Sequence, residues 1–275
     1  MKIRDYVRHH PVGVYFWAAF IISWAGSLLT EGPTFLRGDA VELQDLLVIG
    51  IVVLAGPCLA GLAMSYLVDG RAGLQDLFSR MVRWRVGGRW VAPLLVFPVL
   101  LLAVSLALSA WVSPELAPGF FAPGIVMGLL AGSIEEIGWT GYAFPKMGSK
   151  RSIVSTSLLL GFLHALWHVV PDYLANVHAF GEHWLPYFVG FFVHVVALRV
   201  LIVWVYVNTK SLLLAQLMHA SSTGFFGILI PIVIAPASRS IFYRVYAVAL
   251  SAVAVVVIAR YGGSLRREPG RAVAV

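Results

Sequence analysis

The sequence predicts an all-α fold, a polytopic membrane helix bundle of about eight transmembrane helices. Hydrophobic residues account for 60% of the 275 residues and charged residues for only 12%, a balance far outside that of a soluble domain. Apolar runs long enough to cross a bilayer recur along the whole chain, and the charges between them alternate in sign. Because no internal repeat or soluble stretch interrupts this pattern, we expect residues 1–275 to form a single integral membrane domain.

The expected spans follow one another along the chain. They are Val12–Leu29, Leu46–Val68, Trp90–Val112, Phe120–Phe144, Ile153–Val170, Leu185–Val207, Leu212–Ile234 and Ile241–Arg260. The first run follows a long charged segment and lacks a small-residue cleavage site, which favours an uncleaved span over a signal peptide. An even number of spans leaves both termini on the same side of the membrane.

The charges of the connecting segments predict the orientation. The two tails and the second, fourth and sixth connections are basic, and they carry Lys2, Arg4, Arg8, Arg71, Arg80, Arg83, Arg85, Arg89, Lys146, Lys150, Arg151, Lys210, Arg266, Arg267 and Arg271. The first, third and fifth connections are mainly acidic, and they carry Glu31, Asp39, Glu42, Asp45, Glu115, Asp172 and Glu182. By the positive-inside rule both termini are cytoplasmic. The net charge of +7 therefore reflects membrane orientation, and we expect no nucleic acid as a partner. We predict a multi-pass protein of the cell (plasma) membrane, with the lipid bilayer as its surroundings.

The second connection contains a short amphipathic segment. Apolar residues recur there at helical spacing, namely Leu74, Leu77, Phe78, Met81 and Val82, with arginines on the other faces. This pattern predicts an anchoring helix that lies on the cytoplasmic surface and directs its arginines at anionic lipid.

Two adjacent glutamates, Glu135 and Glu136, lie inside the fourth apolar run. A charged side chain at the centre of a spanning helix costs roughly 2.5–3.5 kcal/mol on insertion scales, so buried charges here indicate a function. Neighbouring side chains on an α-helix differ by about 100°, so the two carboxylates cannot point at one spot. We expect one to face a reaction centre and the other a supporting group. Trp139 shares the face of Glu135, and Thr140 shares the face of Glu136.

Few polar groups on other spans can meet these carboxylates. They are His164 and His168 on the fifth span, Arg199 and His194 on the sixth, and His219 on the seventh. A single membrane histidine usually hydrogen-bonds a neighbouring helix, and we expect this for His194. Two carboxylates together with His168 and His219, brought from three separate spans, indicate a functional site instead.

These residue types are those of a hydrolase. A carboxylate in an apolar pocket can take a proton from water and act as a general base. Imidazoles opposite it can hold a metal ion, or donate hydrogen bonds to an oxyanion as the water attacks a carbonyl group. The single cysteine, Cys58, excludes a cysteine-rich zinc site within the chain.

Three motifs resemble those of the CPBP intramembrane protease family, which includes the type II CAAX prenyl endopeptidases and bacteriocin-processing or bacteriocin-immunity proteins. The family's glutamate pair corresponds to EEIGWT, which begins at Glu135. A histidine four residues after an aromatic corresponds to HALWH, which ends at His168, and a histidine with asparagine or an acidic residue four later corresponds to HASST, which begins at His219. The resemblance extends from about Leu74 to Thr223, so we expect residues 74–223 to form a CAAX-protease-like core.

The resemblance implies a glutamate-activated water that cleaves a peptide bond in a membrane protein or peptide substrate. By this resemblance Glu135 is the base and Glu136 supports it. His168 and His219 bind either the tetrahedral oxyanion or, with Glu135, a divalent metal ion such as zinc. On depth alone His164 fits the glutamates better than His168, and the two form an i, i+4 pair suited to metal binding.

Three supporting positions depart from the motifs. Thr140 replaces an arginine, His164 replaces an aromatic residue and Thr223 replaces an asparagine. The missing arginine would have balanced the charge of Glu136. Arg199 lies at a similar depth, because each residue is roughly 12–15 Å from the cytoplasmic end of its span. We predict that Arg199 pairs with Glu136, and the alternative is that its side chain extends to the membrane interface.

Two other functions remain as alternatives. A catalytically inactive membrane protein of the same fold, which binds a partner or acts in bacteriocin immunity, is favoured by the substituted motif positions. A proton-coupled transporter would also use buried carboxylates and histidines, but it predicts structural repeats and broken helices that the sequence does not show. Retention of both glutamates and both main histidines favours the intramembrane endopeptidase.

Overall fold

The computed structural model describes residues 3–39, 46–148, 151–231 and 234–266. All regular secondary structure within these ranges is helical, which confirms the predicted all-α fold. Several charged residues used to predict the orientation lie outside the described residues, namely Lys2, Glu42, Asp45, Lys150, Arg267 and Arg271. The cytoplasmic location of the termini stays a prediction.

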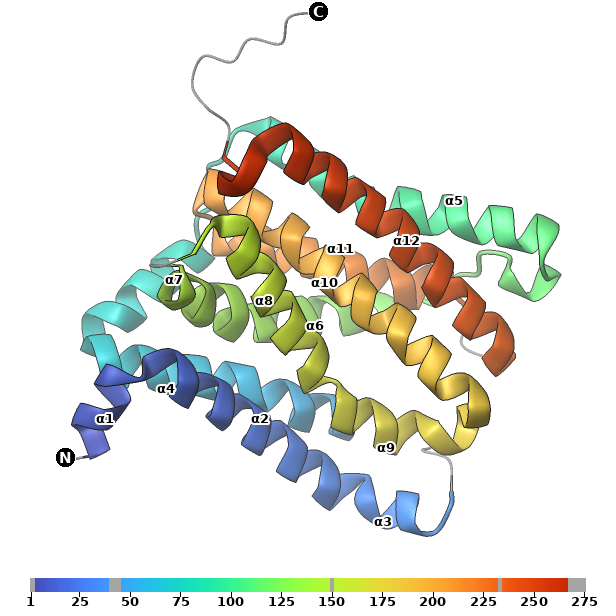
Figure 1. Cartoon of the computed structure of the whole chain (residues 1–275), viewed down its shortest axis with the longest axis horizontal. Helices are drawn as coiled ribbons and strands as arrows, with labels where there is room; N and C mark the ends of the chain where they lie inside the picture. Colours follow the sequence, from blue (N-terminus) through green and yellow to red (C-terminus); the bar gives the residue numbers. More distant parts are fainter. Residues whose placement is uncertain (1–2, 40–45, 149–150, 232–233, 267–275) are drawn as a thin grey trace, which may run out of the picture.

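The main helices are labelled α1 to α12 in chain order (Figure 1). They are α1 (Ile3–His9), α2 (Pro11–Thr30), α3 (Gly32–Leu36), α4 (Leu46–Met81), α5 (Val96–Trp111), α6 (Pro123–Gly138), α7 (Phe144–Met147), α8 (Ile153–Trp167), α9 (Val169–Phe180), α10 (Trp184–Thr209), α11 (Leu212–Leu229) and α12 (Pro236–Tyr261). A π-helix, η4 (Trp139–Ala143), joins α6 to α7. Short 3₁₀ turns are η1 (Gly88–Trp90), η2 (Ala92–Leu95), η3 (Pro114–Leu116), η5 (Gly181–His183) and η6 (Gly262–Ser264).

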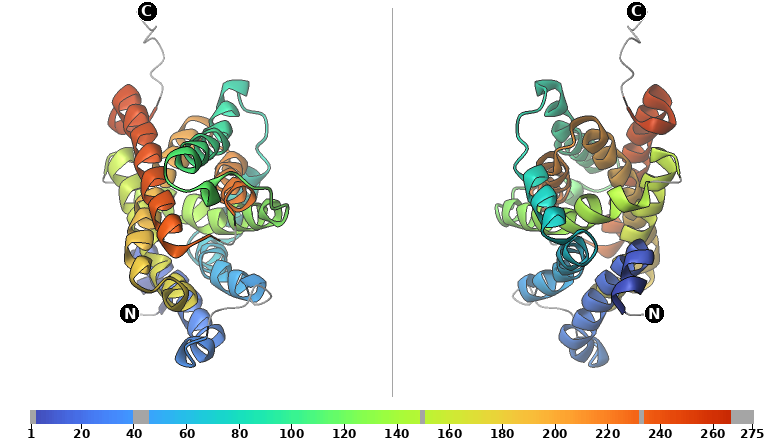
Figure 2. Two further views of the ribbon diagram at one scale, coloured as in Figure 1. Left: turned by 90° about the vertical axis from the view of Figure 1, so that its right-hand side faces the viewer. Right: turned by 90° about the vertical axis from the view of Figure 1, so that its left-hand side faces the viewer.

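Six helical segments among the described residues are long and apolar enough to cross a membrane. They are Pro11–Thr30, Val48–Met81, Gly88–Trp111, Val169–Thr209, Leu212–Leu229 and Pro236–Ser264. The other two expected spans correspond to α8, which is apolar but shorter, and to α6, which carries the glutamates and passes into the π-helix. Figures 1 and 2 show α6 between α2 and α4 on one side and α10, α11 and α12 on the other.

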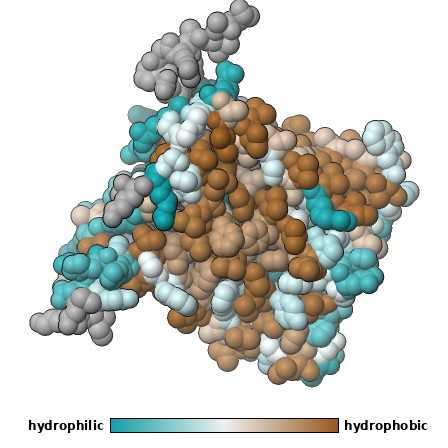
Figure 3. All heavy atoms as spheres, viewed as in Figure 1, coloured by the Kyte–Doolittle hydropathy of each residue, from teal (hydrophilic) through white to brown (hydrophobic). Residues whose placement is uncertain are grey.

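The surface of the bundle is mainly apolar. Figure 3 shows brown, hydrophobic residues across the middle of the visible face and hydrophilic residues toward its ends. Large apolar side chains stand exposed on several helices, among them Trp17, Leu29, Trp111 and Val248. In a membrane such side chains contact lipid, so the surface agrees with a polytopic bundle.

Small residues let α6 and α11 approach closely. A Cβ atom added to Gly128 would lie 2.4 Å from the Cα of Gly224, and one added to Gly132 would lie 2.4 Å from the carbonyl oxygen of Gln216. Small residues four apart are a common way for membrane helices to bring their backbones together. The contact places the C-terminal end of α6, with its glutamates, next to His219 on α11.

A second close contact joins α8 to α10. A Cβ atom added to Gly161 would lie 2.9 Å from the Cα of Val196 and 3.2 Å from the Cβ of Arg199. His164 follows Gly161 by three residues and therefore lies on the same face of α8. The glycine thus sets His164 beside Arg199.

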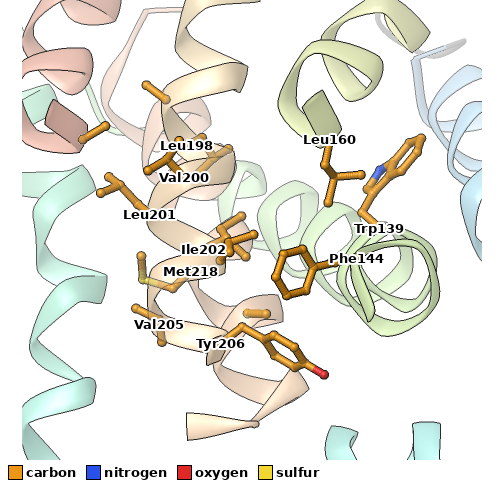
Figure 4. Close-up of a cluster of buried hydrophobic side chains, with 14 of the residues drawn as sticks. Trp139, Phe144, Leu160, Leu198, Val200, Leu201, Ile202, Val205, Tyr206 and Met218 are labelled. Carbon is orange, nitrogen blue, oxygen red and sulfur yellow. The ribbon is translucent and has the colours of Figure 1, made fainter. Parts of the chain in front are cut away.

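Apolar packing surrounds the polar groups. Figure 4 shows side chains of η4, α7, α8, α10 and α11 meeting inside the bundle, where Trp139, Leu160 and Ile202 are all 0% exposed. Between membrane helices such contacts contribute mainly van der Waals packing, because lipid tails are themselves apolar. This tight core holds the helices that carry the polar residues in one arrangement.

The amphipathic segment is the last part of α4. Gly70 has φ 68° and ψ −154°, so the helical backbone is interrupted there and resumes as far as Met81. A backbone with positive φ is readily adopted by glycine. The kink turns the segment so that Leu77 packs inward with 0% exposure.

Arg80 also points inward, which corrects the expectation that the arginines of this segment face lipid. Its guanidinium donates to the carbonyl oxygen of Gly141 at 2.9 Å, to the Tyr206 hydroxyl at 2.8 Å and to Asp76 at 2.9 Å. Hydrogen bonds to a carbonyl group in the π-helix and to a phenol on α10 therefore hold the arginine side chain away from the surface. Arg83, by contrast, is exposed as expected.

Candidate active site

Both glutamates are buried where α6 becomes a π-helix. Glu135 is 3% exposed and Glu136 is 0% exposed, and η4 begins three residues after Glu136. Single π-turns inside α-helices frequently occur at functional sites. Buried carboxylates are costly unless they are paired, so each glutamate requires specific partners.

Glu136 has a charged partner and two polar partners. Its Oε2 accepts hydrogen bonds from Arg199 Nη1 at 2.7 Å and from the Thr140 hydroxyl, and its Oε1 accepts one from His219 Nδ1 at 2.8 Å. Arg199 is 0% exposed, so its side chain does not extend to the membrane interface. The predicted Arg199–Glu136 pair is confirmed. Arg199, on α10, thus supplies the positive charge that the motif arginine would have supplied at position 140.

Glu135 makes a different set of contacts. Its Oε2 accepts hydrogen bonds from Trp139 Nε1 at 3.1 Å and from His164 Nε2 at 2.8 Å. Its Oε1 lies 4.0 Å from His219 Nε2, a separation too long for a direct hydrogen bond and short enough for one shared water molecule. One carboxylate oxygen is therefore held by protein donors, and the other faces an imidazole.

His164 connects the two carboxylates. Its Nδ1 lies 2.9 Å from Arg199 Nη2, while its Nε2 bonds Glu135. The side chain is 1% exposed, and Trp139 packs on its ring at a centroid distance of 5.0 Å. A continuous chain of hydrogen bonds thus runs from Glu135 through His164 and Arg199 to Glu136.

His168 directly follows the last residue of α8. It is half-buried, whereas the other predicted catalytic residues are almost completely buried. Its ring lies against Trp167 and Phe191 at centroid distances of 4.6 and 4.9 Å. Among the predicted catalytic residues, His168 is the one most open to an approaching molecule.

Two residues stand apart from the glutamates. His194 Nε2 lies 3.3 Å from the Ser222 hydroxyl, which confirms the expected hydrogen bond to a neighbouring helix. Thr223 lies one turn after His219 on α11 and is half-buried. Within the described part of the chain, no hydrogen bond joins Thr223 to either glutamate.

The group that could hold a metal ion differs from the predicted set. The ligand atoms of Glu135, His164 and His168 lie within 4.8 Å of one another, and this is the one such group among the described residues. The sequence predicted Glu135 with His168 and His219. In the structure His219 instead has its Nδ1 bound to Glu136.

Sequence reasoning missed two contacts of the site. It did not anticipate that Arg80 supports the π-helix or that His164 bonds Arg199. Both had a local signal. Arg80 follows the buried Leu77 by three residues, and His164 follows Gly161, whose lack of a side chain permits a close helix contact, by the same interval.

Comparison with known proteins finds similarity over the part of the chain that contains these residues. Residues 117–225 match the family model described as type II CAAX prenyl endopeptidase Rce1-like. This match supports the resemblance of the chain to the CPBP family. A curated relative, CAAX prenyl protease 2 of Methanococcus maripaludis, is 32% identical over 102 residues, which cover 36% of this chain and 38% of the relative. The chain thus aligns with less than half of that relative's length.

The family match and the six apolar segments together make the chain an integral, multi-pass membrane protein. The matched residues 117–225 contain Glu135, His168 and His219, the residues that carry the three motifs. The bounds of the protease-like core, predicted as residues 74–223, stay a prediction.

Proposed function

We propose that this protein is an intramembrane endopeptidase of the CPBP type, which hydrolyses a peptide bond in a membrane-associated protein or peptide. The observation that carries the proposal is the asymmetry of Glu135. Two donors hold its Oε2, while its Oε1 faces His219 Nε2 at 4.0 Å. A water molecule between those two atoms would be oriented by both and could lose a proton to the carboxylate.

The first chemical step joins water to the scissile carbonyl group. Glu135 Oε1 takes one proton from the water, and the water oxygen forms a bond to the carbonyl carbon as the carbonyl oxygen becomes negatively charged. His219 and the more open His168 donate hydrogen bonds to this oxyanion. In the second step Glu135 returns the proton to the peptide nitrogen, the carbon–nitrogen bond breaks and the amine leaves. None of these steps requires a metal ion.

Glu136 supports His219 in this scheme. The His219 Nδ1–H group donates to Glu136 Oε1, so the carboxylate fixes the orientation of the ring and favours a proton on Nε2 when negative charge develops nearby. Arg199 and Thr140 in turn hold Glu136 through its other oxygen. Glu136 therefore acts through His219, whereas Glu135 acts on the water.

The substrate class follows from the position of the site. Both glutamates lie inside a bundle whose surface is apolar, so we propose a substrate that reaches them from the bilayer or its interface. The relative named CAAX prenyl protease 2 suggests a C-terminal peptide that carries a prenyl group. Peptides with and without a prenyl group test that suggestion separately from proteolysis itself.

Peptide cleavage by the purified protein in proteoliposomes tests the proposal. We expect Glu135→Gln and His168→Ala to lower kcat by roughly 10²–10⁴-fold, the contribution typical of general acid–base groups. The matched controls are Glu182→Gln and His183→Ala, which change a solvent-exposed pair outside the site and should cleave like the wild type. If Glu135→Gln and His168→Ala cleave as well as the wild type, the proposal is wrong.

The second candidate is a catalytically inactive membrane binding or bacteriocin-immunity protein. Thr223 favours it, because this threonine replaces a motif residue and makes no hydrogen bond to the glutamates within the described chain. Thr140 does not favour it, since Arg199 supplies the missing charge. A protein that cleaves no peptide in the assay above, yet binds peptide with unchanged affinity in Glu135→Gln, would support this candidate over the peptidase.

A further inference from the structure

We infer that His164 is a positioning residue whose tautomer is set by Arg199, so that it donates a hydrogen bond to Glu135 and directs the reactive oxygen of that carboxylate. In the steps derived above His164 only holds Glu135 Oε2, and it neither takes nor gives a proton. The assignment of its tautomer stands on the hydrogen bonds alone, whereas its catalytic purpose rests on the proposed peptidase function.

The tautomer follows from the chemistry of arginine. A guanidinium group has five N–H donors, no acceptor, and keeps its proton in proteins. Arg199 Nη2 lies 2.9 Å from His164 Nδ1, so Nδ1 must be the acceptor and carries no proton. The single ring proton of the neutral imidazole then resides on Nε2. A doubly protonated ring would place an N–H group against the guanidinium inside the bundle, where both residues are at most 1% exposed.

The proton on Nε2 has a consequence for Glu135. Nε2 lies 2.8 Å from Glu135 Oε2, and in this tautomer it can only donate. Trp139 Nε1, which is also a donor only, bonds the same oxygen at 3.1 Å. Two donors therefore hold Oε2, and Oε1 is left as the atom of Glu135 that faces His219.

Arg199 joins this arrangement to the second carboxylate. Its Nη1 donates to Glu136 and lies 3.1 Å from the Thr140 hydroxyl, while its Nη2 fixes His164. Thr140 and His164 are two of the three positions where the chain departs from the motifs it resembles. Both contact the same guanidinium, so these two departures form one connected arrangement.

The same tautomer conflicts with metal binding by Glu135, His164 and His168. A metal-bound histidine coordinates through a lone pair and donates its other N–H to an acceptor. In His164 the lone pair of Nδ1 is engaged by Arg199, and Nε2 bears the proton. A neutral imidazole in this tautomer has no lone pair left for a metal ion, so coordination would require the loss either of that proton or of the Arg199 hydrogen bond. The group as arranged does not fit a divalent cation.

Nitrogen-15 NMR of the histidine-labelled protein in lipid nanodiscs tests the tautomer directly. We expect His164, assigned from the signal lost in His164→Gln, to show an unprotonated Nδ1 and a protonated Nε2, and these signals to stay unchanged when Zn²⁺ is added. In Arg199→Met we expect His164 to lose its preference for the tautomer with the proton on Nε2. A protonated Nδ1, a zinc-dependent shift of the His164 signals, or an unchanged tautomer in Arg199→Met would overturn the inference.

Peptide cleavage then tests the positioning role. His164→Phe removes both hydrogen bonds, and we expect kcat to fall roughly 10- to 100-fold with little change in KM, as for other residues that orient a reacting group. His164→Gln keeps one acceptor and one donor and should recover most of that loss. The control is His194→Phe, which removes another buried histidine and should leave kcat within about two-fold.

The outcomes separate this inference from the proposed function. Equal kcat values for His164→Phe and the wild type, or equal losses in His164→Phe and His164→Gln, would overturn the positioning role while the peptidase function stands. A wild-type protein that cleaves no peptide but shows the expected His164 signals would remove the peptidase function and leave the tautomer assignment supported. The NMR measurement needs only the conservative variant His164→Gln to assign the signal, and the tautomer itself is observed in the wild-type protein.

Discussion

Arg199 and Glu136 form an ion pair of 2.7 Å in which both side chains are 0% exposed, although they come from α10 and α6. Burial of either charge alone would be very costly, and their attraction offsets that cost only with good geometry and additional hydrogen bonds. Thr140 and His219 supply those bonds to Glu136, and His164 accepts one from Arg199. The pair is the element on which the other polar contacts of the site depend.

Removal of the guanidinium should destabilise the protein, and its relocation should restore stability. We expect Arg199→Met to cost about 3–5 kcal/mol, because it leaves Glu136 buried without a counter-charge. The double variant Arg199→Met/Thr140→Arg places a guanidinium one turn after Glu136 and should recover at least half of that loss. Thermal unfolding in detergent measures both. If the double variant is no more stable than Arg199→Met, the loss of stability in Arg199→Met does not come from the missing counter-charge of Glu136.

Because α6 packs closely on α11, we expect two glycine substitutions to change the stability of the protein by different amounts. Gly128→Ala places a methyl group 2.4 Å from the Cα of Gly224, so we expect a loss of roughly 1–3 kcal/mol and reduced activity as His219 moves from the glutamates. Gly50→Ala, in α4, is the matched control, since a Cβ there meets nothing within 4 Å. It should be neutral or stabilising by up to about 1 kcal/mol. Equal melting temperatures for the two variants would contradict the packing argument.

Arg80 and Arg83 belong to the same basic segment, but we expect them to contribute differently to the stability of the protein. Arg80→Met removes charged hydrogen bonds to Gly141 and Tyr206, and bonds of this kind contribute about 1.5–3 kcal/mol. We expect a melting temperature lower by several degrees. Arg83→Met removes the same charge from an exposed side chain and should change stability by less than about 0.5 kcal/mol. Similar losses in both variants would show that the effect comes from the surface charge alone.

The raised pKa of Glu31, which lies between α2 and α3, predicts that the stability of the protein falls as pH rises. Burial, together with the negative charge of Asp172, raises the pKa of this carboxyl group to about 7. The folded protein therefore holds this proton more tightly than the unfolded chain, so the stabilisation is complete below about pH 4.5 and is lost as pH rises through about 7.

The Glu31→Gln variant tests that sign. Its neutral amide does not ionise, so its melting temperature should fall less between about pH 5 and about pH 8 than that of the wild type. The difference should be a few degrees, since about 1 kcal/mol corresponds to roughly 2–4 °C in a protein of this size. Parallel curves for the two proteins would contradict the raised pKa of Glu31.

Much of the site could be predicted because its residues are conspicuous in an apolar sequence. Glu135 and Glu136 stand out by their cost in a membrane, and Arg199 is the basic residue whose depth matches that of Glu136. Depth along a span follows from a rise of about 1.5 Å per residue, so it needs no tertiary structure. The prediction that Arg199 and Glu136 pair succeeded on this ground.

The contacts of His164 and Arg80 could not be predicted in the same way. Which residue of a pair such as His164 and His168 meets a carboxylate depends on how each helix is rotated about its axis and how closely it approaches its neighbour. Gly161 sets that approach for α8, and the kink at Gly70 sets it for the end of α4. The effect of either glycine is visible only when the facing helix is in place.

The sequence by itself determined the helical membrane fold, the glutamate pair and the residues able to oppose it, because hydropathy and charge are properties of each segment alone. Only the tertiary structure decided that one oxygen of Glu135 faces His219, that His164 lies between Glu135 and Arg199, and that Arg80 turns inward. Hydrogen bonds require atoms to meet within about 3 Å, and that precision arises from the packing of one helix on another.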